Sequence, residues 1–261
     1  MPVSRRPLTS SCYDWAMPFA VERFDAREWP SEVLEPIFAD AFPSFIGADK
    51  VAAAYIDRVR AYFADFNIML IDETDQPVAW GWGVPIKWNG ELTDLPTGYT
   101  DTTKRAVETH DSASMTDTFV ICGAIVDRRR ARQGIAGAIV AALRDLPAAG
   151  SLARVIVPVR PTIKSMYPLT AIDTFASWTR SDGLPLDPWL RTHCRIGGRI
   201  IATAPQSQVM TGTVDQWEKW TLQKFPSTGE YIIPNGLQPL HIDREEDEGT
   251  YIEPNVWIRH R

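Results

Sequence analysis

Two regular spacings of hydrophobic residues run along the chain and predict its helices and strands. A repeat of about 3.6 positions is typical of an amphipathic helix, and a short apolar run rich in β-branched residues is typical of a buried strand. In the N-terminal part these patterns predict strands at 20–24, 68–71 and 78–87 and helices at 31–38 and 51–63. Turn residues between the last two strands join them into a hairpin. The predicted order is therefore strand, two helices and hairpin.

The segment Thr118–Leu146 carries the most informative pattern. An apolar run at 119–126 is followed by an arginine-rich stretch, and beyond Gly134 apolar residues recur at helical spacing. A helix should therefore begin near Gln133 or Gly134. A further apolar run at 154–159 predicts another strand. Strand, helix and strand in this order imply a right-handed crossover and parallel pairing of the two strands.

The loop between this strand and this helix has the chemistry of an anion site. The first N–H groups of a helix have no partner within it, and the macrodipole places positive charge there. Gly134, Ala136 and Gly137 leave room for a phosphate close to the backbone, and the arginines between 128 and 132 add positive charge. A solvated basic turn is the ordinary interpretation of such a cluster. Its position between a buried strand and a glycine-opened helix favours phosphate binding.

Composition and charge narrow the classes of function. The 261 residues are 44% hydrophobic and carry a net charge of −6, which argues against a general nucleic-acid binder. Three cysteines without metal-type spacing predict no disulfide framework. No apolar run has the length of a membrane span, and residues 1–17 lack the hydrophobic segment of a secretory signal. We therefore expect a cytoplasmic protein with no nucleic-acid or membrane partner.

Changes in composition suggest three parts. Residues 1–17 read as a flexible N-terminal arm, and 18–205 as an α/β core. Within the core, the polar stretch 88–117 reads as an insertion or a lid, with a short helix near 104–110. Residues 206–261 read as a C-terminal extension that extends the sheet, covers a cleft or forms a homodimer contact. Near its end, His241 and the acidic run that follows lack the spacing of a metal loop, so no metal site is expected.

These features together resemble the GNAT superfamily of acyl-CoA-dependent N-acyltransferases. The superfamily motif is a strand followed by Q/R-x-x-G-x-G/A at the start of a helix, and Gly134-Ile135-Ala136 supplies its second half. The position three residues before Gly134 is Ala131, flanked by Arg130 and Arg132, which are suited to take the place of the usual Gln or Arg. The order of the elements over 18–205 also agrees with the superfamily.

The resemblance implies a fold and a co-substrate. The fold is an α/β, mixed and mostly antiparallel sheet with helices on both faces, splayed where the motif strand meets the next parallel strand. The co-substrate is acetyl-CoA or another acyl-CoA. By resemblance, the main chain of Ala124, Ile125 and Val126 would hold the pantetheine arm. The pyrophosphate would lie against the loop and helix start, at Arg129, Arg130, Arg132, Gln133, Gly134, Ile135, Ala136 and Gly137.

The catalytic acid has two candidates. The family often ends the helix after this region with Y-x-x-x-G-F, and in this chain His193 takes the place of the tyrosine, with Gly197 four residues later. An imidazolium has a pKa suited to protonating a thiolate. Tyr167 is the alternative donor, and an ordinary structural histidine is the alternative reading of His193. Glu108 or Asp111 in the insertion are candidates for the general base.

The aromatic pair Trp80 and Trp82 lies on one face of the predicted hairpin strand, because side chains alternate along a strand. Packing within the sheet is the ordinary role for such residues, and a wall for the acyl acceptor is the alternative.

The resemblance implies that the chain transfers an acyl group, most simply acetyl, from CoA to an amine of a small molecule by direct attack. Two alternatives remain at this stage. One is a different reaction on the same scaffold, with a carrier-protein thioester as donor or with decarboxylation of an acyl thioester. The other is a CoA-sensing domain without catalysis.

Overall fold

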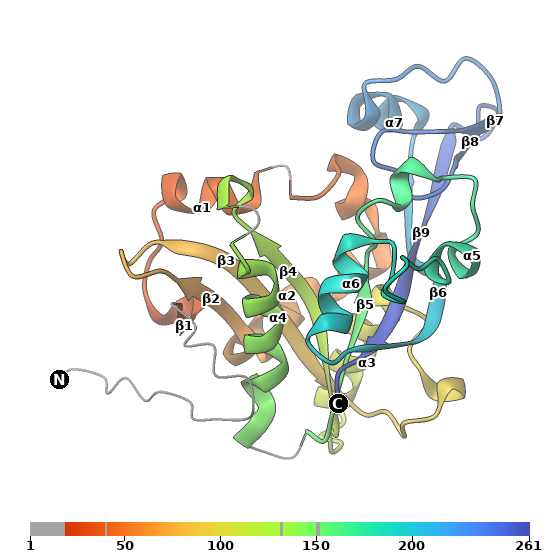
Figure 1. Ribbon diagram of the computed structural model, residues 1–261. Helices are drawn as coiled ribbons and strands as arrows, with labels where there is room; N and C mark the ends of the chain where they lie inside the picture. The colour runs from red at the N-terminus through yellow and green to blue at the C-terminus, as the bar shows by residue number, and fades with distance from the viewer. Residues whose placement is uncertain (1–18, 40, 131–132, 150–151) are drawn as a thin grey trace.

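A single mixed sheet of nine strands forms the centre of the protein (Figure 1). The computed structural model describes residues 19–39, 41–130, 133–149 and 152–261, so the expected arm at 1–17 and Arg132 lie outside the described residues. The strands are β1 Ala20–Arg23, β2 Asn67–Ile71, β3 Pro77–Ile86, β4 Thr118–Val126, β5 Arg154–Val159, β6 Arg199–Gly212, β7 Gly229–Tyr231, β8 Leu240–Asp243 and β9 Glu248–Arg259. Their order is β1-β2-β3-β4-β5-β9-β8-β7, and β6 also pairs with β9.

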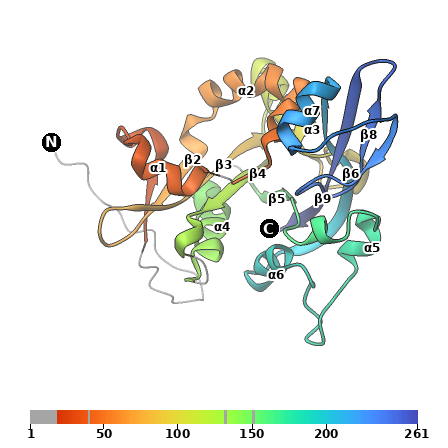
Figure 2. The same ribbon diagram turned by 90° about the horizontal axis from the view of Figure 1, so that it is seen from above.

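Helices cover both faces of the sheet (Figure 2). They are α1 Ser31–Phe38, α2 Lys50–Tyr62, α3 Tyr99–Asp111, α4 Ile135–Asp145, α5 Ile172–Ala176, α6 Pro188–Arg195 and α7 Val214–Thr221. The apolar sides of α4, α5 and α6 share one hydrophobic core with β4 and β5. On the opposite face, α2 and α3 enclose a second core around the fully buried Trp88. The predicted strand, helix pair, hairpin and motif region are all present, and the mixed α/β fold is confirmed.

The sheet splits between β4 and β5. These two strands are parallel, and they pair over only three residues, Thr118–Val120 with 154–156. Beyond this point they lean apart, so the molecule has two arms (Figure 1). One arm contains β1 to β4, and the other contains β5, β9, β6, β8 and β7. We call the place where pairing ends, at Val120 and Ile156, the vertex.

The C-terminal residues extend the central sheet, which is one of the three roles expected for them, and the expected boundary does not separate them from the core. That boundary, between 205 and 206, falls inside β6. The last strand, β9, inserts between β5 and β6 and pairs with both along their length. Its apolar residues Val256, Trp257 and Ile258 are buried. Residues 206–261 therefore complete one arm of the sheet.

The expected insertion at 88–117 is also built into the fold and does not form a lid. It contains α3, which is longer than the expected 104–110 helix and buries its small residues Thr102, Thr103, Ala106 and Val107 against α2 and the sheet. The polar composition of this segment hid its buried side, because small threonines and alanines give a weak hydrophobic period.

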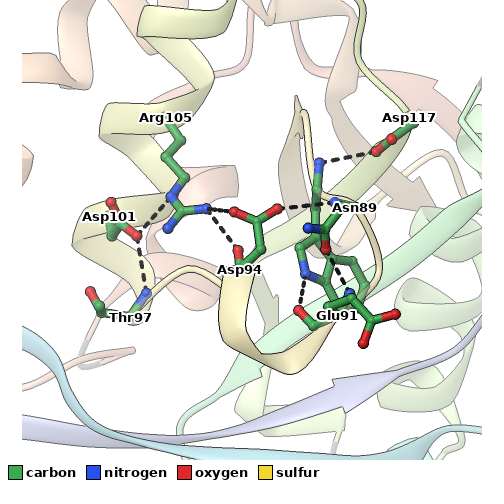
Figure 3. Close-up of polar contacts among 8 residues, drawn as sticks. Asn89, Glu91, Asp94, Thr97, Asp101, Arg105 and Asp117 are labelled. Atoms are coloured by element: carbon green, nitrogen blue, oxygen red, sulfur yellow. Dashed lines mark hydrogen bonds and ion pairs between the residues drawn. The ribbon is translucent and has the colours of Figure 1, made fainter.

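A polar network holds the loop that precedes α3 (Figure 3). Arg105 on α3 pairs with Asp101 at 2.8 Å and donates to the main-chain oxygen of Asp94, also at 2.8 Å. Asp94 in turn accepts from the main-chain N–H of Asn89. The indole N–H of Trp88 donates to the main-chain oxygen of residue 91 at 2.8 Å. These bonds fix the start of α3 relative to the sheet.

Candidate active site

One edge of β4 has no strand partner beyond the vertex. In the described part of the chain, residues 121–126 pair with β3 alone, because β5 has moved away. The strand is buried as far as Ile121 and becomes partly exposed from Cys122 to Val126. N–H and C=O groups on such an edge are ready to bind an extended ligand. The predicted pantetheine residues Ala124, Ile125 and Val126 all lie on this edge.

A β-bulge in β4 lies two residues beyond the vertex, at Cys122. Trp82 pairs with Gly123 and Gly83 pairs with Ile121, so Cys122 is an extra residue on β4. Bulges redirect side chains and often occur beside active sites. Cys122 packs in the core around Trp88, and burial raises the pKa of its thiol far above the ordinary value. The thiol therefore stays protonated, which excludes a nucleophilic role at neutral pH.

The predicted anion site is at the first turn of α4. Gly134 is its N-cap with φ of 77°, a left-handed conformation that favours glycine, and no side chain caps the helix. A Cβ at Gly134 would meet no atom within 4 Å, so the approach is open. Gln133 and Gly134 are exposed, whereas Ile135 is buried in the core and offers only its main chain. Ala136 and Gly137 are half-buried. The helix start can therefore receive an anion through backbone N–H groups.

Two of the predicted arginines are engaged with carboxylates. Arg129 pairs with the buried Asp127 at 2.8 Å, and this guanidinium lowers the pKa of that carboxyl. Arg130 pairs with Asp72 at 2.6 Å. Burial opposes ionisation of Asp72, but hydrogen bonds from Thr74, residue 76 and Arg130 outweigh it and lower its pKa to about 2. Both carboxylates thus hold the arginines in place beside the start of α4.

His193 is buried beside the vertex. Its Nδ1 lies 2.9 Å from Nε2 of His260, and the main-chain N–H of His260 donates to the oxygen of Val155 at 2.8 Å, next to the last paired residue of β5. Burial, and then the neighbouring His260, lower the pKa of His193 to about 3. The ring is therefore neutral near pH 7, and our expectation of an imidazolium at this position is corrected.

Tyr167 lies apart from His193. Its ring is 36% exposed and makes edge contacts with Trp178 at 4.9 Å and Phe175 at 6.1 Å, on the arm that contains β5. His193 instead contacts Trp189 and His260. The structure therefore does not bring the two predicted proton donors together.

Trp80 and Trp82 lie on one face of β3, as the alternation of the strand predicts, with ring centroids 6.4 Å apart. Both are half-buried. Trp82 also contacts the ring of Tyr99 at 6.2 Å in an edge arrangement. Together these three rings form an aromatic wall behind the β4 bulge. Trp82 lies in the core that α2 and α3 enclose, whereas Trp80 packs against Phe38 of α1 at 5.1 Å and donates its indole N–H to Asn67.

Tyr99 is a further candidate site residue that the sequence did not reveal. Its N–H donates to Oγ of Ser207 on β6 at 2.8 Å, while its ring contacts Trp82 on β3. Gly98 permits this approach, because a Cβ there would lie 2.2 Å from Cα of Ser207. Tyr99 therefore spans the two arms behind the vertex. The only sequence signal was a Pro-Thr-Gly turn before an acidic first helical turn.

The two predicted general bases are far from Tyr99. Glu108 and Asp111 lie in the last turns of α3, whose 13 residues span about 20 Å. Asp111 pairs with Arg58 at 3.1 Å, and Glu108 lies 3.9 Å from Lys104. The structure places neither carboxylate at the bulge.

Two further properties concern metals and membranes. Within the described residues, no cluster of three or more His, Cys, Asp or Glu side chains is arranged to hold a metal ion. No helix in the same part of the chain has the length and hydrophobicity needed to cross a bilayer.

Comparisons with known proteins agree with this architecture. No protein-family model matches the chain. A curated relative, arginine N-acetyltransferase avaD of Aspergillus versicolor, is 28% identical over 247 residues, which cover 84% of each chain. Among solved structures, the loading GNATL domain of CurA from Lyngbya majuscula is similar with a TM-score of 0.55 and 15% identity, covering 93% of this chain and 96% of that one.

A second structure, the GphF GNAT-like decarboxylase in complex with isobutyryl-CoA, also has a TM-score of 0.55, with 13% identity over 92% of this chain and 98% of its own. At these identities the two structures show a shared fold. The curated relative, which is named as an N-acetyltransferase, is similar over most of both chains.

Proposed function

We propose that the chain is an acyltransferase of the GNAT type, which transfers an acyl group, most simply acetyl, from acyl-CoA to the amine of a small molecule; its similarity to a curated N-acetyltransferase and its fold support this. The observation that carries the proposal is the free edge of β4, at residues 121–126, leading to the uncapped start of α4. A strand edge suits the amide groups of pantetheine, and a helix start suits a pyrophosphate.

The co-substrate fits these two features in one orientation. The pyrophosphate binds at the N–H groups that follow Gly134, with Arg129 and Arg130 beside it. The pantetheine arm then runs along Ala124, Ile125 and Val126 towards the vertex, which places the thioester near the bulge. Of the other predicted residues, Gln133, Ala136 and Gly137 contribute through the main chain at the helix start.

The acceptor approaches from the face of the sheet opposite α4, past the aromatic wall of Trp80, Trp82 and Tyr99. Aromatic faces attract cationic groups, and the net charge of −6 favours a cationic substrate. The curated relative is named for arginine, which is such a molecule. A small cationic amine such as arginine is therefore the acceptor class that we propose.

Acyl transfer at the vertex requires one proton to move from the attacking nitrogen to the leaving sulfur. The amine nitrogen attacks the thioester carbonyl, and N–H groups of the β4 edge stabilise the oxyanion. The C–N bond forms and the C–S bond breaks. The neutral ring of His193 relays this proton: it takes the proton of the attacking nitrogen as the C–N bond forms and passes it to the thiolate as the C–S bond breaks. Its lowered pKa makes the protonated ring a strong donor to the sulfur. The chain thus needs no covalent intermediate.

The test combines binding with turnover. Calorimetry should detect CoA binding, and thiol release from acetyl-CoA should require an amine such as arginine. His193→Gln should lower kcat by about 10²- to 10⁴-fold, the usual contribution of general acid–base catalysis, while Tyr167→Phe should leave it nearly unchanged. Absence of CoA binding would overturn the proposal. CoA binding without turnover of any amine would favour a sensor, and thiol or CO₂ release from another acyl thioester without an amine would favour the alternative reaction.

A further inference from the structure

His193 and His260 form a pair that the proposed function does not fully explain. His193 is 1% exposed and lies on α6, and His260 follows the last residue of β9. Their rings are joined by one hydrogen bond of 2.9 Å between Nδ1 of His193 and Nε2 of His260. The other two ring nitrogens, Nε2 of His193 and Nδ1 of His260, are buried and have no partner within the described residues.

Two buried ring nitrogens without hydrogen-bond partners lower the stability of the folded protein. A buried polar atom without a partner costs about 1–3 kcal/mol, and native proteins contain few of them. The neighbouring ring of Trp189 packs edge-on against His193 with centroids 4.6 Å apart and offers no polar contact. A reacting group at the vertex would supply the missing partner for Nε2 of His193.

The hydrogen bond couples the protons of the two rings. Burial holds both rings neutral, so each carries one N–H and one lone pair. One ring must donate in the shared bond and the other must accept. If His193 donates from Nδ1, its Nε2 keeps a lone pair and can receive a proton. If His260 donates, Nε2 of His193 carries a hydrogen and cannot act as a base.

Charged groups on α4 lie near the pair. Burial is the largest cause that lowers the pKa of His260; the guanidinium of Arg144 lowers it further, and Asp145 raises it to a smaller extent. Arg144 is also bonded to Asp145 and donates to the main-chain oxygen of Ile196, beyond α6. Cys194 follows His193 on α6, and burial raises the pKa of its thiol, so it brings no charge.

The arginines around the C-terminus complete these surroundings. Arg259 and Arg261 flank His260 in the chain, and Arg199 pairs in register with Arg259 on the neighbouring strand. Arg195 ends α6 and is exposed. Among these groups, a positive charge next to His260 opposes a second proton on that ring, which keeps His260 neutral and able to accept the Nδ1 hydrogen of His193.

We propose that His260 is a positioning residue for the acyl transfer: it accepts the Nδ1 hydrogen of His193 and so keeps the Nε2 lone pair of His193 directed at the thioester. During transfer, Nε2 receives the proton of the attacking nitrogen, the C–S bond breaks, and the same proton passes to the thiolate sulfur. His260 keeps its own hydrogen throughout. This inference rests on the proposed function, because it assigns His193 to the reaction.

A direct test uses NMR on the intact protein. Two-bond ¹H–¹⁵N correlations of histidine rings distinguish nitrogens that carry hydrogen from those with a lone pair. The proposal expects a lone pair at Nε2 of His193 and a hydrogen at its Nδ1 between pH 6 and 8. A hydrogen at Nε2 of His193 over this range would overturn it, whatever the activity of the enzyme.

Kinetics of variants supply the second test. His260→Ala should lower kcat by about 10- to 100-fold, as is usual for partners that orient a reacting histidine, with KM for acyl-CoA within about twofold. The wild-type rate should show no histidine limb between pH 5 and 8. In His260→Ala, water replaces the lost ring, so an acid limb should appear near pH 6. His260→Gln, which can still accept the hydrogen, should recover part of kcat.

The matched control is His241→Ala, since His241 is exposed and pairs with Glu230 on β7 at 2.7 Å. If His260→Ala matches this control in kcat and in pH profile, the positioning role is excluded and the proposed function stands. If acetyl-CoA and amine do not react with the wild type, the proposed function itself fails. A folding defect would appear as a loss of the cooperative thermal transition, and the NMR result would then decide.

Discussion

Gly123 is the residue on which the geometry of the bulge depends most closely. A Cβ at this position would lie 2.6 Å from Nε1 of Trp82 and 2.9 Å from its Cδ1. The indole therefore lies directly over the backbone of β4, and the proposed acceptor side has its present shape only because residue 123 has no side chain.

We therefore expect Gly123→Ala to displace Trp82. The change should raise KM for the amine acceptor several-fold and lower the free energy of unfolding by about 1–3 kcal/mol, as is usual for overpacking. Steady-state kinetics and thermal unfolding measure the two effects. Gly47→Ala is a suitable control, because a Cβ there would meet no atom within 4 Å. An unchanged KM for the acceptor would argue against a role of Trp82 in acceptor binding.

The His193–His260 pair should make the protein sensitive to acid. Both pKa values are lowered on folding, from 6.5 to about 3 and about 4, so below pH 6.5 the unfolded chain binds more protons than the folded one. Stability is therefore fully present above pH 6.5 and falls as pH decreases towards 4. Each group contributes a slope of up to about 1.4 kcal/mol per pH unit.

Thermal unfolding between pH 7 and 4 measures this slope. The double variant His193→Gln and His260→Gln should flatten it in that range, because glutamine does not titrate. The exposed His241→Gln should leave the slope unchanged. An equal slope in the wild type and the double variant would show that other groups dominate acid unfolding.

At the level of elements, the loop before α4 is held by carboxylates as well as by its backbone. Asp72, at the end of β2, accepts from Thr74 and from the N–H of residue 76, and it also pairs with Arg130. Arg130 is therefore held in position before any ligand binds. This arrangement reduces the conformational entropy that an arginine loses when it engages a phosphate.

We expect Asp72→Asn to weaken CoA binding. Loss of this partly buried pair removes about 1 kcal/mol, equivalent to about fivefold in Kd, while kcat at saturating acyl-CoA stays the same. Calorimetry with CoA measures the change. Asp215→Asn on α7, which removes the exposed pair with Lys219, is the control. Equal affinities for CoA in the two variants would show that Arg130 does not contribute to CoA binding.

On the scale of the whole molecule, the two arms depend on β9. It lies between β5 and β6 and pairs with β5 over residues 156–159 and with β6 over most of its length. Trp257 and Ile258 on β9 contribute to the cores on the two opposite faces of the sheet. The arm that carries His260 therefore exists only when the C-terminal strand is in place.

Ending the chain after residue 247, so that β9 is lost, should abolish the cooperative thermal transition seen by circular dichroism. Both β5 and β6 would expose a strand edge, and the buried face of Trp257 would be missing. As a control, Glu245→Gln and Glu246→Gln alter the exposed turn before β9 and should unfold like the wild type. A truncated chain that unfolds cooperatively would restore the view of residues 206–261 as a separable extension.

The amino-acid sequence by itself determined the local elements and the helix start at which we predict the anion site. Apolar spacing was enough to predict β4, α4 and β5, and Gly134 was enough to place the start of α4, because helix and strand periods and glycine's left-handed conformation act within a few residues of one another. Trp80 and Trp82 were placed on one face for the same reason.

Tertiary structure alone decided the rest of the site. His193 and His260 are 67 residues apart in the chain, and Tyr99 is 108 residues from Ser207, so no local spacing connects them. The neutral state of His193, the role of Tyr99 and the central position of β9 follow from burial and from long-range strand pairing. Such contacts depend on which distant strands pair with one another, and a periodic pattern along the chain does not encode this pairing.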